Sequence, residues 1–180
     1  MTHGATILTY EGKAPRIDPD AFVAPGARII GDVEIAADAS IWYNVVIRGD
    51  VDTIRIGKRT NVQDGTVIHV SGGKFRTTIG EDVLIGHLAM VHGCTLHDRA
   101  FVGFGAIVMD GCVIEADGML AGGAMLTPGK RIPAGELWSG RPAKFMRALS
   151  PEEIARNQQG VAGYVLEGRR HRQAVEAAKG

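Results

Sequence analysis

Aliphatic residues recur at every sixth position through most of the chain. The repeat runs from residue 23 to residue 138 and is interrupted near residues 50–55 and 70–78. An amphipathic helix repeats about every 3.6 residues and a half-buried strand alternates, so neither element explains this period. The recurring positions are Val23, Ile29, Ile35, Ile41, Ile47, Ile56, Val62, Ile68, Ile79, Ile85, Val91, Leu96, Val102, Val108, Ile114, Leu120, Leu126, Ile132 and Trp138.

A period of six is typical of a parallel β-helix, in which each six-residue unit forms one flat side and points one apolar residue inward. Three sides close a coil of about 18 residues, so residues 23–138 hold roughly six coils. Stacked about 4.8 Å apart, these coils predict a prism about 30 Å tall. The two interruptions are expected to be loops inserted into the coils. The fold class is therefore mainly β, with a β-helix domain over residues 1–149 and repeats over about residues 21–143.

The last part of the chain changes character and predicts a C-terminal α-helix and tail over residues 150–180. Ser150 suits the N-cap, Pro151 the first helical position and Glu153 the closing position of a capping box. The apolar face that follows is modest and glycines weaken it, so packing must hold the helix. We therefore expect the helix to lie along one side of the prism. Its apolar residues are Ile154, Val161 and Val165.

Composition narrows the classes of function. The chain has 25 glycines in 180 residues and 6% aromatic residues, which favours a repetitive β architecture with tight corners. Lys and Arg balance Asp and Glu at 20 each, which gives no electrostatic basis for binding nucleic acid or a membrane surface. No apolar run approaches the roughly 20 residues that span a bilayer, and the N-terminus does not resemble a secretion signal, so a cytoplasmic location is expected. Cys94 and Cys112 lie one coil apart and are expected to stack as reduced core residues.

Four of the six histidines lie within residues 69–97. Imidazole is the commonest transition-metal ligand in proteins, and three imidazoles with one open position are typical of a catalytic zinc site. The spacing alone also fits surface residues at β-helix corners. His97 follows the inward Leu96 and is expected at the surface. His3 and His171, near the termini, are also expected to be exposed. The candidate metal ligands are His69, His87 and His92.

Short runs around these histidines carry a family resemblance. They are Arg48-Gly49-Asp50, Asn61-Val62-Gln63-Asp64, Ile68-His69-Val70, Ile85-Gly86-His87, Val91-His92-Gly93-Cys94-Thr95 and Gly140-Arg141-Pro142-Ala143-Lys144. Together they resemble the γ-class carbonic anhydrase family over nearly the whole chain, from about residue 21 to residue 164. The three histidines are the specific part of the resemblance. The last run is less specific, because hexapeptide acyltransferases carry similar endings.

The resemblance implies a homotrimer of left-handed β-helices with a metal ion between subunits. His69 and His92 would come from one subunit and His87 from its neighbour. The metal would be Zn²⁺, although Fe²⁺ or Co²⁺ can serve in this class. The implied reaction is the reversible hydration of CO2 to bicarbonate by metal-bound hydroxide.

The resemblance also assigns roles to three polar residues near the metal. Gln63 matches a residue that orients the metal-bound water, Asn61 matches a polar active-site residue, and Tyr164 matches a C-terminal tyrosine near the metal. Structural alternatives remain open for two of them. Gln63 follows the inward Val62 and can point into solvent, and Tyr164 can simply pack against the prism.

Three charged residues match an ion-pair network at the subunit interface that is also linked to bicarbonate handling. In this chain they are Arg48, Asp50 and Asp64. Pairing of Arg48 with Asp64 can equally be structural, because an ion pair at an interface need not take part in catalysis.

The chain departs from the archetype of the family in its acidic proton shuttle. Val51 and Gly72 stand where the archetype has acidic residues, and residues 71–76 form a short basic loop. Asp52 is a possible substitute by proximity. Two alternatives to the carbonic anhydrase therefore stay open. One is a hexapeptide acyltransferase or CoA thioesterase, and the other is a non-catalytic, metal-bound trimeric scaffold or binding protein.

Overall fold

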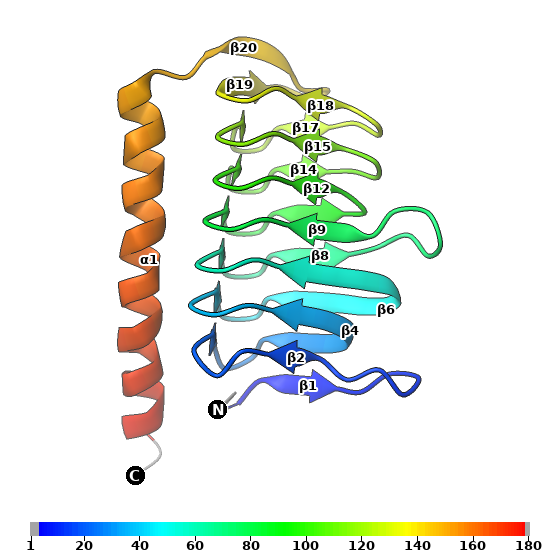
Figure 1. Cartoon of the computed structure of the whole chain (residues 1–180), viewed down its shortest axis with the longest axis vertical. Coiled ribbons are helices and arrows are strands. Elements are labelled where there is room, and N and C mark those ends of the chain that lie inside the picture. Colours follow the sequence, from blue (N-terminus) through cyan, green and yellow to red (C-terminus); the bar gives the residue numbers. More distant parts are fainter. Residues whose placement is uncertain (1–3, 179–180) are drawn as a thin grey trace.

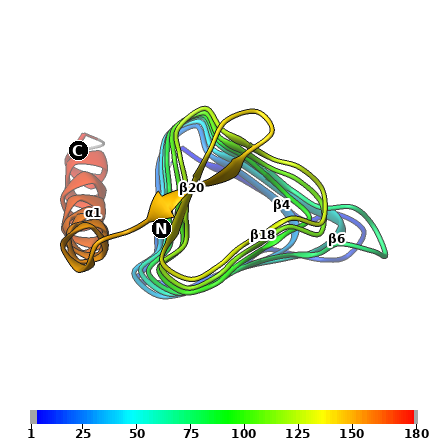
Figure 2. The same ribbon diagram turned by 90° about the horizontal axis from the view of Figure 1, so that it is seen from above.

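The chain forms a triangular prism with one long helix beside it (Figure 1). The computed structural model describes residues 4–178. Seen from above, the coils superpose as a triangle and the helix covers one of its sides (Figure 2). The fold is a left-handed parallel β-helix with a C-terminal helix, as the six-residue period and the resemblance predict.

One side of the prism is a sheet that faces the helix. Its parallel strands each belong to a successive coil, and the antiparallel β20 closes its end. Val23 lies in the first of these strands and Trp138 in the seventh, so the six coil steps predicted between them are confirmed. The strands are β3 (Phe22–Val23), β5 (Ser40–Ile41), β7 (Asn61–Val62), β10 (Leu84–Ile85), β13 (Phe101–Val102), β16 (Met119–Leu120), β19 (Glu136–Ser139) and β20 (Lys144–Ala148).

The other two sides form one continuous sheet, because the long strands β4 and β6 pair across both of them. All pairs within this sheet are parallel. Its strands are β1 (Thr6–Leu8), β2 (Arg16–Ile17), β4 (Arg28–Ile35), β6 (Val46–Ile56), β8 (Val67–His69), β9 (Thr77–Ile79), β11 (Met90–His92), β12 (Thr95–Leu96), β14 (Ile107–Val108), β15 (Val113–Ile114), β17 (Met125–Leu126) and β18 (Arg131–Ile132).

The core is the column of aliphatic side chains inside the prism. Of the predicted inward positions, all except Trp138 are buried, and Trp138 packs partly buried against the same core. Cys94 and Cys112 lie in this core with free thiols, as expected. Burial raises the pKa of the Cys94 thiol, so it is neutral under ordinary conditions.

The expectation of a loop at residues 50–55 is wrong. These residues continue β6, which pairs with β4 on both sides of the interruption. Gly31 faces Gly49 and Val33 faces Ile54, so three extra residues are taken up as a bulge within the strand. The second interruption does contain a loop, a tight turn in which Ser71 and Phe75 form an isolated bridge between β8 and β9.

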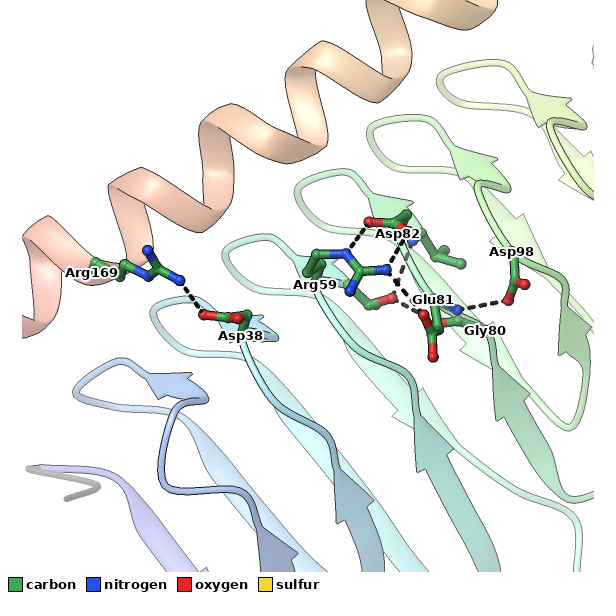
Figure 3. Close-up of polar contacts among 9 residues, drawn as sticks. Asp38, Arg59, Gly80, Glu81, Asp82, Asp98 and Arg169 are labelled. Carbon is green, nitrogen blue, oxygen red and sulfur yellow. Dashed lines mark hydrogen bonds and ion pairs between the residues drawn. The ribbon is translucent and has the colours of Figure 1, made fainter.

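One corner of the prism, which we call the charge ladder, carries a charged residue in every coil from β5 to β16. Each has a left-handed backbone with φ between 56° and 61°, and the signs alternate along the prism. Arg59 makes two 2.7 Å contacts with Asp82 in the next coil (Figure 3). These pairs are partly exposed, so each contributes at most about 1 kcal/mol. The ladder consists of Asp38, Arg59, Asp82, Arg99 and Asp117.

The helix α1 (Pro151–Ala177) begins as predicted, with Ser150 as N-cap and Glu153 completing a capping box. It docks on the ladder through Arg169, which donates to Asp38 at 2.8 Å (Figure 3). Gly168, which weakens an isolated helix, is buried against the prism here. A Cβ at this position would lie 3.4 Å from the Cβ of Ser40.

The expectation that His171 is exposed is wrong. Its Nδ1 lies 2.9 Å from the Tyr43 hydroxyl, and its ring stands edge-on to Trp42 with centroids 4.8 Å apart. The reason is helical periodicity, which places His171 one turn beyond the packed Gly168 on the same face of α1. His3 lies outside the described residues. No helix within residues 4–178 is long and apolar enough to cross a membrane.

The start of α1 is expected to make stability depend on pH. The hydrogen bond from Arg147, then that from the Ser150 backbone, lowers the pKa of Glu153 from 4.5 to about 2. Its contribution is therefore present above about pH 4.5 and is lost as pH falls toward 2. Glu153→Gln should lower the unfolding midpoint by about 2–4 °C at neutral pH, measured by circular dichroism, and by less near pH 3.

The matched control is Glu176→Gln, at the opposite end of α1, which should track the wild-type protein at every pH. A Glu153→Gln deficit that is the same at neutral pH and near pH 3 would contradict this account.

Candidate metal centre

His69 and His92 come together because β8 and β11 are stacked in register. The two residues are direct backbone partners at the ends of these strands. Nδ1 of His69 lies 3.0 Å from Nε2 of His92, and the ring centroids are 5.0 Å apart. Both side chains are mostly buried, at 19% and 30% exposure.

A carboxylate lies at the other nitrogen of each ring. Asp50 Oδ1 is 2.9 Å from His69 Nε2, and Asp110 Oδ1 is 2.6 Å from His92 Nδ1. If both rings are neutral and donate to these carboxylates, the two remaining lone pairs face each other at 3.0 Å. That arrangement is favourable only with a cation between the nitrogens, which can be a third proton or a metal ion. The donor set therefore fits a metal ion.

The two carboxylates stay ionised in this setting. Burial tends to raise the pKa of Asp50, but hydrogen bonds from His69 and Arg48 outweigh it, and the net pKa is lowered. Burial likewise opposes hydrogen bonds from His92 and Ser71 at Asp110, whose net pKa is also lowered. The pair of rings is thus flanked by negative charge, as a cation requires.

His87 lies at the opposite end of the same prism side. It lies in the corner turn that leads into β11, whereas His92 ends that strand. Its Nδ1 pairs with Asp64 Oδ2 at 2.9 Å, and its backbone N–H donates to Gln63 Oε1 at 3.2 Å. Gln63 is buried, so the alternative that it points into solvent is wrong.

A single chain therefore divides the predicted site into two halves. One half, at the end of β8 and β11, holds His69, His92, Arg48 and Asp50. The other, at the far corner, holds Gln63 and Asp64 beside His87. Within residues 4–178 of one chain, no three His, Cys, Asp or Glu side chains are grouped to hold a metal ion. Arg48 pairs with Asp50 rather than with Asp64.

Asn61 and Tyr164 lie on the side that α1 covers. Asn61 is fully buried, and its Nδ2 donates to Ser40 Oγ at 2.9 Å, while its Oδ1 is without a hydrogen-bond partner among the described residues. Tyr164 of α1 stands edge-on to Trp42 with centroids 5.7 Å apart. Burial, and secondarily the charge of Asp64, raises the pKa of the Tyr164 hydroxyl. Tyr164 thus packs on the prism, near the His87 half.

Large apolar side chains are exposed beside both halves. Leu88 is 73% exposed and Phe104 60% exposed, and the Phe104 ring lies 5.4 Å from that of His87. Leu88 also has a left-handed backbone, φ 58°, at a corner where the other coils carry glycine or asparagine. An open groove of about 340 Å³ lies beside His92, lined mainly by apolar residues, Met90, Ile107, Val108, Met109 and Pro128, together with Asp110.

Sequence reasoning missed Asp110 and Ser71. Asp110 contacts His92, and Ser71 donates to Asp110 Oδ2 at 2.7 Å. A signal was present, because Asp110-Gly111-Cys112 repeats the spacing of His92-Gly93-Cys94 one coil later. His97, expected at the surface, is half-exposed and lies 3.6 Å from Glu115.

The chain is similar in sequence to two curated proteins over most of its length. A scan of the sequence against protein-family models finds no match. The chain is 47% identical over 184 residues to gamma carbonic anhydrase 1, mitochondrial, of Arabidopsis thaliana, covering 99% of this chain and 66% of that protein. It is 42% identical over 149 residues to a probable carbonic anhydrase of Methanocaldococcus jannaschii, covering 83% of this chain and 93% of that one.

A solved structure shares both fold and sequence. The hexapeptide transferase family protein from Anaplasma phagocytophilum aligns with a TM-score of 0.88 and 50% identity, covering 91% of this chain and 96% of that chain. The present chain spans just under two thirds of the Arabidopsis relative and nearly all of the Methanocaldococcus one.

The Ser40–Asn61 hydrogen bond is expected to be worth a measurable part of the stability. Ser40→Ala leaves the buried Asn61 amide without its partner and should lower the free energy of unfolding by about 1–3 kcal/mol in urea denaturation. Asn61→Ala in the same background should then cost less than it does alone, because the shared bond is already lost. Strictly additive effects would contradict the assigned bond.

Proposed function

The chain belongs to the γ-class carbonic anhydrase family, and from this premise we propose that it catalyses the reversible hydration of CO2 to bicarbonate. The observation that carries the proposal is the 3.0 Å approach of His69 Nδ1 and His92 Nε2, with a carboxylate at the other nitrogen of each ring. His87, the third imidazole of the set, lies at the far corner of the same prism side. A second copy of the chain would bring its His87 to this pair.

The proposed metal is Zn²⁺, held by His69 and His92 of one subunit and His87 of the next. Zinc with three imidazole ligands lowers the pKa of a bound water to about 7, which supplies a nucleophile for CO2 at neutral pH. Asp50 and Asp110 hold the two adjacent rings at their outer nitrogens. A carboxylate in this position orients a ligand ring and raises its basicity.

Gln63 is proposed to orient the reacting oxygen. Its Oε1 is held by the backbone N–H of His87 at 3.2 Å, so its amide nitrogen is the end of the side chain able to donate to a substrate. Its burial beside His87 keeps this amide in place. Asn61 and Tyr164 are proposed to shape the same half of the site, and Asp64 to orient His87 through its 2.9 Å contact.

The proposed assembly is a homotrimer, and the exposed apolar residues support it. A leucine in the left-handed region costs about 1–2 kcal/mol more than glycine, and an exposed leucine gains nothing in return. Leu88 is 73% exposed in one chain and adjoins His87. Burial against a neighbouring subunit would offset this cost and bring His87 to the open groove beside His92.

We propose that the proton released during CO2 hydration passes to buffer molecules in solution rather than to an acidic side chain of the protein. Val51 and Gly72 occupy the positions of the acidic shuttle expected from the family. A Cβ at Gly72 would lie only 3.2 Å from that of Val51. Asp52, the possible substitute, has its Oδ1 taken by the Thr53 backbone N–H at 2.7 Å. We include a cytoplasmic setting in the proposal because both thiols are free and buried.

Subunit mixing tests whether two chains build each site. His69→Ala and His87→Ala should each lose bound zinc and CO2 hydration. When the two variants are co-expressed, every mixed trimer contains one interface with both intact halves. Random mixing should therefore restore about a quarter of the wild-type zinc content and activity, measured by elemental analysis and stopped flow.

Co-expression of His69→Ala with His92→Ala is the matched control, because both lesions lie in the same half and no interface is restored. Full activity of His87→Ala alone would contradict the shared site. Acyl transfer from a CoA thioester, without CO2 hydration, would favour the acyltransferase alternative.

Replacement of Leu88 tests the interface itself. Leu88→Asn suits the left-handed backbone but removes the apolar contact, so it should weaken self-association at least about tenfold while the unfolding midpoint of the separated chain does not fall. Sedimentation equilibrium measures the first quantity and circular dichroism the second. Leu166→Asn, an exposed leucine on α1, is the control and should associate normally. Unchanged association of Leu88→Asn would exclude Leu88 from the interface.

A further inference from the structure

We propose that Asp110 is a positioning residue that fixes the protonation pattern of the His92 ring and thereby its readiness to bind the metal. This proposal rests on the proposed function, because it assumes that His92 is a ligand. Asp110 was not among the residues that the family resemblance identified. The argument depends on the contacts of its two carboxylate oxygens.

The first oxygen holds the ring. Asp110 Oδ1 lies 2.6 Å from His92 Nδ1, and a carboxylate can only accept there, so Nδ1 carries the proton. In the neutral ring, His92 Nε2 is then the nitrogen with a free lone pair, and it faces His69 Nδ1 at 3.0 Å. Asp110 thus selects the tautomer in which the inner nitrogen can bind a cation.

The second oxygen holds the carboxylate. Ser71 Oγ donates to Asp110 Oδ2 at 2.7 Å, so neither oxygen is free to turn away from its partner. Ser71 is itself fixed, because it exchanges backbone hydrogen bonds with Phe75 across the turn at 3.2 and 3.1 Å. The short loop after β8 therefore supports the ligand ring through Asp110.

The backbone leaves room for this arrangement at Gly93. A Cβ at this position would lie 2.2 Å from Asp110 Oδ1 and 2.9 Å from the Cβ of Phe75. Gly93 also has a left-handed backbone, φ 54°. Any larger residue would push Asp110 away from His92, so the glycine next to the ligand is required by the carboxylate that orients it.

The test measures the His92 tautomer in the metal-free protein and the zinc affinity of the same samples. With ¹⁵N-labelled histidine at alkaline pH, the wild-type His92 ring should carry its proton on Nδ1, and resonances are assigned through His92→Gln. Asp110→Asn should shift the population toward the Nε2–H form. It should also weaken zinc binding about 10–100-fold in competition with a chelator. Ser71→Ala should weaken it by less than about tenfold.

Asp117→Asn is the matched control, since it makes the same chemical change at the charge ladder, and should leave both tautomer and zinc affinity unchanged. Asp110→Asn that keeps the wild-type tautomer and affinity would overturn the proposal, even if it loses stability. Failure of the wild-type protein to bind zinc would overturn the proposed function instead, and the tautomer measurement would still decide whether Asp110 positions the ring.

Discussion

The structure depends on the corners of the prism, where most turns from one side to the next place one residue in the left-handed region. Glycine accepts this conformation without strain and occupies many of these positions, while the charged residues of the ladder occupy one row of them. Because the corners repeat, every coil lies directly above the last, and residues one coil apart become neighbours. His69 and His92, 23 positions apart in sequence, meet for this reason. The chemistry of the site is therefore a product of register rather than of any local motif.

The same regularity explains why one chain is not sufficient for the proposed site. A flat prism side keeps its two corners apart, and the described residues of one chain bring no third His, Cys, Asp or Glu ligand to the pair. A rigid scaffold can unite distant corners only by placing two copies next to each other, corner against corner. The exposed Leu88 and the apolar groove beside His92 lie at these two corners. Catalysis and assembly would therefore share the same surfaces.

The sequence predicted what periodicity controls. The inward residues, the six coil steps, the capping box at Ser150 and the stacking of the cysteines all follow from spacing or from local capping chemistry. Spacing could not reveal that residues 50–55 stay in a strand. A bulge preserves the pairing of β4 with β6 but interrupts the six-residue repeat. Spacing also missed the packing of His171, because that depends on where the helix lies against the prism. It missed the role of Asp110, because that depends on a contact between two coils. Family resemblance selected the three histidines, and the geometry explains how two of them meet.

The alternating charges of the ladder limit how this fold can change in length. An inserted or deleted coil would leave every aliphatic side chain inward, so the core alone would tolerate it. At the corner, however, removing one inner rung such as that of Arg99 would bring Asp82 against Asp117, and two like charges at strand spacing repel each other. Among the inner rungs, changes by pairs of coils preserve the alternation of sign, whereas loss of a terminal rung such as Asp38 leaves it intact. A helix anchored by Arg169 at one end of the ladder and by Gln158 near the other would have to change length at the same time. The ladder thus adds an electrostatic cost, of the size of a surface ion pair, to the gain or loss of one inner coil.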